Sequence, residues 1–78
     1  MDNHDSSSEI MITIYKTRIK QLRDAAGRQR QTAEQCHTLA RQSRVVTDRI
    51  VYEEFARRAL EDAKRFDGRA DEWSRLSA

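Results

Sequence analysis

Cys36 and His37 are the residues whose types could perform chemistry, because a thiol beside an imidazole is the makeup of a nucleophile–base pair or of part of a metal site. Neighbouring residues of a helix, however, project about 100° apart and do not face each other. The only other histidine, His4, lies in a polar segment at the amino end. We therefore expect Cys36 to be a buried packing residue beside a half-exposed His37, with no metal and no other cofactor. If a dimer axis passes near Cys36, an intermolecular disulfide on oxidation is an alternative.

Two pairs of adjacent carboxylates, Glu53-Glu54 and Asp71-Glu72, are the other candidates for acid–base chemistry. A di-iron site in a helical bundle needs glutamates that point inward and a Glu-x-x-His pair. The inward positions of the apolar repeats in this sequence carry neither. We interpret the four carboxylates as solvated surface charge and predict a non-enzyme, with no catalytic and no metal-ligating residue.

The element that carries Cys36 is a long helix, predicted over about residues 9–43 from an apolar repeat. The steps of the repeat alternate between three and four residues, as in the packing stripe of a coiled coil. Its positions are Ile12, Tyr15, Ile19, Leu22, Ala26, Gln29, Ala33, Cys36, Ala40 and Ser43. Ser6 and Glu9 have the spacing of a capping box before it, so residues 1–8 are predicted to be a disordered polar tail. The isoleucines of residues 10–14 also alternate as in a short strand, and that alternative stays open.

A second helix is predicted over about residues 48–76, after a turn at about 44–48 with Ser43, Thr47 or Asp48 as candidate caps. Its repeat is Tyr52, Ala56, Ala59, Ala63, Phe66, Ala70 and Trp73. Gly68 could end the helix early, but the repeat passes through it in register, which favours a continuous helix.

Two long helices with a short connection predict an all-α fold, an antiparallel two-helix hairpin that forms a single domain over residues 9–78. Residues that face each other then have numbers adding to about 90, which places Arg23 beside Asp67 and His37 beside Glu53. Large side chains lie at both ends of the hairpin, with alanines between them.

Apolar residues beside each repeat widen the apolar face beyond what one hairpin covers. We expect self-association, most simply a homodimer that forms a four-helix bundle; the alternative is that these residues only broaden the contact within the chain. The predicted packing and oligomer core is Ile12, Tyr15, Ile19, Leu22, Cys36, Leu39, Tyr52, Phe55, Leu60, Phe66, Trp73 and Leu76.

Basic residues flank the core of the first helix at Lys16, Arg23, Arg30 and Arg44, in a seven-residue repeat whose fourth position is His37. Residues 16–44 hold eight basic and two acidic side chains, a balance of +6, although the whole chain is only +2. This basic stripe either pairs with acids of the second helix or faces a partner's phosphates. Nucleic-acid binding is therefore kept as a weaker alternative, because no recognition motif accompanies the stripe.

Length and composition exclude several classes. A chain of 78 residues is one small domain, and no apolar run of about 18 residues could span a membrane. The amino end lacks the charged and apolar regions of a signal peptide, and a single cysteine excludes an internal disulfide. We expect a cytoplasmic protein.

The run Ala33-Glu34-Gln35-Cys36-His37-Thr38-Leu39-Ala40, then Phe55-Ala56-x-x-Ala59 and Trp73-x-x-Leu76, resembles a set of short proteobacterial helical-hairpin proteins. Those proteins follow the pattern A-E-x-C-x-x-L-A, a turn, and an alanine-rich helix ending in W-x-x-L. The apolar Ile10–Ile14 segment and Val45-Val46 depart from it. The resemblance implies a hairpin fold and no activity.

The sequence thus predicts a small non-catalytic protein–protein interaction module, a regulator, adaptor or inhibitor, that acts as a homo-oligomer and binds another protein. The alternative is a nucleic-acid-associated accessory protein that uses the basic face of the first helix. An enzyme subunit or metal-binding bundle is the remaining hypothesis, and the sequence offers it no ligand set.

Overall fold

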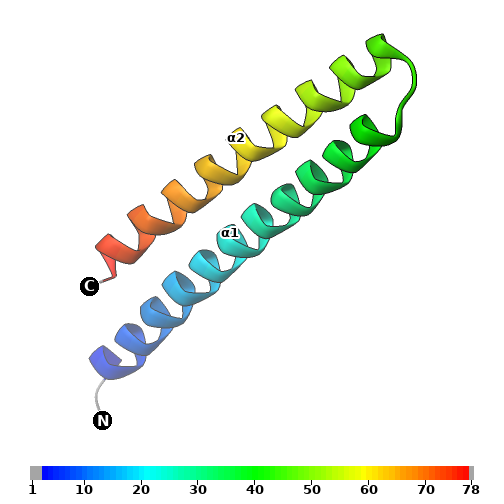
Figure 1. Ribbon diagram of the computed structural model, residues 1–78. Helices are drawn as coiled ribbons and strands as arrows, with labels where there is room; N and C mark the ends of the chain where they lie inside the picture. The colour runs from blue at the N-terminus through cyan, green and yellow to red at the C-terminus, as the bar shows by residue number, and fades with distance from the viewer. Residues whose placement is uncertain (1–2, 78) are drawn as a thin grey trace.

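The computed structural model describes residues 3–77, and it describes side chains from Ser8 onward. Helix α1 spans Asn3–Gln42 and helix α2 spans Val46–Leu76, and these residues include no strand. The two helices lie antiparallel, so that both chain ends are at the same end of a thin rod (Figure 1). The predicted all-α hairpin is therefore confirmed.

Helix α1 begins earlier than expected. Residues 3–8, assigned above to a disordered tail, are helical, while residues 1 and 2 of that tail lie outside the described part. A capping-box pattern is only a local preference, and neither proline nor glycine interrupts this stretch. The helix passes through the residues expected to cap it. Residues 10–14 are helical too, which settles the choice between helix and strand.

The turn is held by Ser43, although not as a conventional cap. Its Oγ accepts a hydrogen bond from the Val45 backbone N–H at 3.3 Å and lies 3.2 Å from the Val45 carbonyl oxygen, to which it donates. The residue that precedes α2 is Val45, which makes no capping side-chain bond. Thr47 and Asp48, also expected as caps, lie inside the first turn of α2, where the negative charge of Asp48 suits the helix dipole.

Gly68 does not end the second helix. Helix α2 continues from Val46 to Leu76, and neither Gly68 nor Gly27 adopts a positive φ. A Cβ atom built on either glycine meets no neighbouring atom within 4 Å. The glycines are therefore not required by close packing or by backbone conformation.

The interior between the helices consists almost entirely of alanine. The buried apolar residues are Leu22, Ala26, Ala33, Ala40, Ala56, Ala59, Ala63 and Ala70, and Leu22 is the only large one. Small side chains let two helices approach closely, but each removes little apolar area from water. The hairpin measures 68 × 15 × 12 Å, which is a single layer of helices.

Larger side chains close the interior towards the open end of the hairpin. The rings of Tyr15 and Trp73 meet edge to face, with centroids 5.4 Å apart and planes at 60°. The residue numbers of this pair are close to the facing rule, in which they add to about 90. The expected arrangement, with large residues outside an alanine middle, is present at this end.

Most of the predicted packing core is not buried within one chain. Leu22 is buried, at 3% exposure, while Tyr15, Ile19, Cys36, Tyr52, Phe66 and Trp73 are half-buried. The remaining members are exposed: Ile12, Leu39, Phe55, Leu60 and Leu76. Two helices cover only the stripe between them, so residues at the margins of that stripe stay in water. Ile12 is exposed for a second reason, because the start of α1 extends past the end of α2 (Figure 1).

Candidate interaction surface

Two long flanks of the hairpin border the alanine interior, and they differ in chemistry. The charged flank consists of Lys16, Arg23, Arg30, His37 and Arg44 from α1 with Glu53, Leu60, Asp67, Asp71 and Ser74 from α2. The apolar flank has Met11, Ile14 and Leu39 from α1 with Val51, Phe55 and Leu76 from α2 at its two ends. In an antiparallel pair of helices, equivalent heptad positions lie on the same side, which assigns these residues to the two flanks.

The charged flank is joined across the helices by arginine–aspartate pairs. Arg23 Nη1 lies 3.3 Å from Asp67 Oδ1, and Arg23 Nη2 lies 2.9 Å from an oxygen of Asp71. Arg30 Nη1 donates to the other oxygen of Asp67 at 2.8 Å. The hydrogen bond from Arg30 is the main reason that the pKa of Asp67 lies below its ordinary value of 3.8. The predicted contact of Arg23 with Asp67 is therefore present.

His37 also pairs across the helices, because its Nδ1 lies 3.0 Å from Glu53 Oε2. This is the second contact expected from the facing rule. Cys36, in contrast, packs against the buried cluster of Ala33, Ala56 and Ala59. The thiol and the imidazole thus project to different parts of the hairpin, as neighbours on a helix should.

The basic stripe proposed as a phosphate-facing surface is neutralised in its middle. Arg23 and Arg30 are bound to aspartates, so their charges are balanced within the chain. Lys16 and Arg44, at the two ends of the stripe, make no ion pair with the side chains of residues 8–77. The structure therefore does not bring the four residues together as one free basic surface.

The outer face of α2 carries a separate ion-pair network within the helix. Arg57 binds both Glu54 and Glu61, and Arg58 Nε lies 3.2 Å from Glu54. The hydrogen bond from Arg57 lowers the pKa of Glu54 to about 2. Glu54 thus stays charged at neutral pH.

The apolar flank has no such pairing at its ends, where large side chains project into water. Towards the turn, Leu39 and Phe55 are 44% and 50% exposed, and Val51 lies one helical turn before Phe55. At the open end, Leu76 is 70% exposed beside the exposed Ile14. Isolated exposed apolar residues are ordinary, whereas these residues gather at the two ends of one flank.

Two exposed apolar residues, Ile50 and Val51, were not singled out from the sequence. Val51 completes the cluster of the apolar flank near the turn, and Ile50 forms an apolar tip there with Val45 and Val46. Neither occupies a core position of the repeats, which is why a search for those positions missed them. Helical spacing was the available signal for Val51, which precedes Phe55 by four residues.

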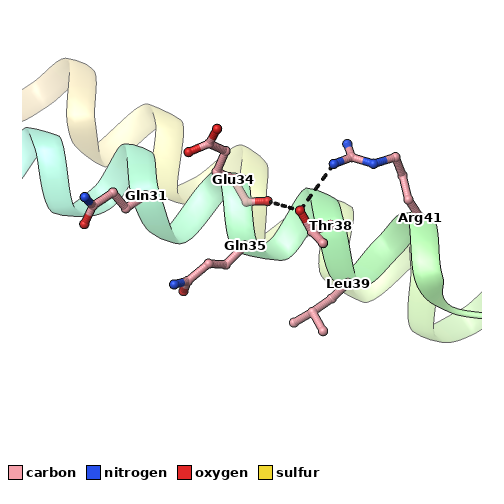
Figure 2. A pocket seen from close by; sticks show the side chains of 6 residues that line it. All are labelled: Gln31, Glu34, Gln35, Thr38, Leu39 and Arg41. Carbon is pink, nitrogen blue, oxygen red and sulfur yellow. Dashed lines mark hydrogen bonds between the residues drawn. The ribbon is translucent and has the colours of Figure 1, made fainter.

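Three hollows of the surface are each bordered by residues of a single helix. One of them is bordered by Gln31, Glu34, Gln35, Thr38, Leu39 and Arg41, all from α1 (Figure 2). There Thr38 Oγ1 donates to the Glu34 carbonyl oxygen at 3.0 Å and accepts from Arg41 at 3.2 Å. Side chains of a single helix cannot enclose a small molecule as the walls of a ligand pocket do. Leu39, which borders this hollow, is exposed and can be reached by the broad surface of another molecule.

Two further features bear on the chemistry of the surface. Within the part of the chain that the structure describes, no cluster of three or more His, Cys, Asp or Glu side chains is arranged to hold a metal ion. Along the same residues, neither helix has an apolar stretch long enough to cross a membrane.

Comparison with protein-family models, curated proteins and solved structures found no match to the chain.

Proposed function

We propose that the chain is a small, non-catalytic protein–protein interaction module that works as a homo-oligomer, most simply a homodimer forming a four-helix bundle. One observation supports this most: the buried interior of the hairpin is nearly all alanine, while the large apolar side chains of residues 8–77, apart from Leu22, are half-buried or exposed. Burial of large apolar side chains is the main stabilising contribution to a helical fold. A second copy supplies the layer that the single hairpin lacks.

The role of such a module is that of a regulator, adaptor or inhibitor that binds another protein. The apolar tip of Val45, Val46 and Ile50 supports a further contact, because it lies at the turn rather than on the apolar flank. We place the protein in the cytoplasm, where a lone thiol such as Cys36 stays reduced. The resemblance to short proteobacterial hairpin proteins stays a prediction that is consistent with this role.

Light scattering across a dilution series tests the proposal. The expected mass is twice the 9.2 kDa of the chain, falling towards 9.2 kDa on dilution. A mass of 9.2 kDa at every concentration, with the helices intact by circular dichroism, would overturn the homo-oligomer.

The alternative of a nucleic-acid-associated protein rests on the basic balance of residues 16–44. The aspartate partners of Arg23 and Arg30 count against it. A salt titration of binding to a random-sequence duplex distinguishes the two, because phosphate contacts make the affinity fall steeply with salt. We expect a slope near zero.

A further inference from the structure

We propose that the second copy docks on the apolar flank, with a two-fold axis parallel to the helices and α1 of each copy lying over α2 of the other. The inference rests on the proposed function, since it specifies the surface and geometry of the same self-association. It is supported by the distribution of charge on the two flanks and by the register that symmetry imposes.

The charged flank is unsuited to a second copy. Its carboxylates and guanidiniums already pair within the chain, as in the contacts of Asp67 with Arg23 and Arg30. Copies meeting there would desolvate ion pairs that water now solvates. Buried ion pairs oppose association.

Symmetry determines the register on the apolar flank. A rotation about an axis parallel to the helices does not shift any residue along the helix direction. Each residue of the second copy therefore lies at the same height along the axis as the same residue of the first copy. Within the hairpin, residues at one height have numbers that add to about 90, as in the pairs Arg23–Asp67 and His37–Glu53. The same rule therefore applies between α1 of one copy and α2 of the other.

This register matches apolar residues at both ends of the flank. Near the turn, Leu39 meets Val51 of the second copy, with Phe55 one turn away. At the open end, Ile14 meets Leu76 of the second copy. All five side chains are exposed in the single hairpin, so the docking covers the residues that have no packing partner in one chain.

The same register matches opposite charges between the apolar ends. Arg28 meets Asp62 of the second copy, and Arg18 meets Glu72. Within residues 8–77, Arg18, Arg28 and Glu72 make no ion pair, and Asp62 has only Arg65, at 3.6 Å. The side chains that would pair are thus free or weakly engaged in the hairpin.

The remaining levels bring no like charges together. Here Arg58, Arg65 and Arg69 face small or neutral residues of the other copy's α1, namely Thr32, Ala25 and Gln21. The small Ala25, near the middle of α1, lets this helix approach α2 of the other copy closely. At each level of the flank, apolar side chains therefore meet apolar ones, opposite charges meet, or an arginine meets an uncharged residue.

A two-fold axis perpendicular to the helices is the other way to cover this flank, and charge opposes it. It would lay α1 on α1, where residues 16–44 carry a balance of +6 in each copy. The parallel axis lays α1 on α2, whose residues 48–76 hold seven basic and eight acidic side chains. Electrostatic complementarity selects orientation in this way.

A charge exchange tests the geometry with the full chain. We expect Arg28→Glu and Asp62→Arg each to raise the dimer dissociation constant about tenfold, measured by sedimentation equilibrium. The double variant exchanges the two charges, so opposite signs face each other again across the interface, and it should recover most of the wild-type affinity. Lys64→Glu, on the other side of α2, is the matched control and should leave the constant within about twofold.

Each other outcome overturns a defined part of the proposal. If the wild type dimerises and neither single variant weakens it, the surface is wrong while the homo-oligomer stands. If both weaken it and the double variant does not recover, Arg28 and Asp62 do not face each other across the interface and the parallel axis is wrong. If the wild type does not dimerise at all, the proposed function fails with the geometry. Circular dichroism of every variant confirms that the helices are intact.

Discussion

At the scale of single residues, ion pairs on the charged flank and on the outer face of α2 lower the pKa values of two carboxyl groups. Asp67 accepts hydrogen bonds from two arginines of the other helix, and Glu54 accepts from two arginines of its own helix. Both carboxyls have pKa values below the ordinary range. Acids held in this way stay ionised and orient helices rather than transfer protons.

Acid should therefore weaken the hairpin through these carboxyls. Because the pKa of Asp67 is lower in the folded chain than in the unfolded chain, its contribution is full above about pH 4 and is lost as the pH falls through the lowered pKa. We expect the melting temperature of the wild type to fall between about pH 5 and pH 2 more than that of Asp67→Asn. Equal slopes for the two proteins would show that Asp67 contributes nothing to folding.

Among the side chains of residues 8–77, Leu22 is the one large apolar group that is buried, at 3% exposure. Truncation to alanine removes apolar contacts and leaves a cavity that the thin structure fills only in part. We expect Leu22→Ala to lower the free energy of unfolding by about 2–5 kcal/mol in urea titrations. Leu60→Ala, at an exposed position, is the control, and a similar loss there would contradict the assignment of Leu22 as the core.

At the scale of the helices, the apolar repeat predicted both elements, their antiparallel arrangement and the contacts Arg23–Asp67 and His37–Glu53. Those features follow from helical periodicity, which is present in the residue order. The start of α1 and the cap of α2 were not predicted correctly. Helix ends depend on small local preferences, and here Val45 precedes α2 without any capping side chain.

The flanks were only partly predictable for a different reason. The repeats identified Leu39, Phe55, Leu60 and Leu76 as lying beside the core, but not whether one chain covers them. Whether one chain covers them depends on how the two helices pack. The alanine interior lets α1 and α2 approach closely, but the residues beside the core stay exposed. Val51 was missed because it lies further round α2 from the core positions.

Gly68 offers a test of the continuous helix. Since a Cβ atom there meets nothing within 4 Å and the backbone is helical, alanine should fit without strain. We expect Gly68→Ala to raise the free energy of unfolding by about 0.5–1 kcal/mol, measured by chemical denaturation. A loss of stability would mean that Gly68 lies at a helix break or a close contact.

At the scale of the whole molecule, a rod of 68 × 15 × 12 Å with one large buried side chain is an incomplete core. Six of its exposed apolar residues lie on one flank, namely Met11, Ile14, Leu39, Val51, Phe55 and Leu76. In the proposed dimer, a second copy covers this flank. Folding and association are therefore expected to be coupled, as in obligate dimers whose monomers are only marginally stable.

Thermal unfolding followed by circular dichroism at several protein concentrations tests this coupling most directly. We predict that the melting temperature rises steadily over roughly a hundredfold increase in concentration, because mass action favours the assembled form. A cooperative transition at one temperature across the whole range would contradict it, since that is the behaviour of a hairpin that folds alone.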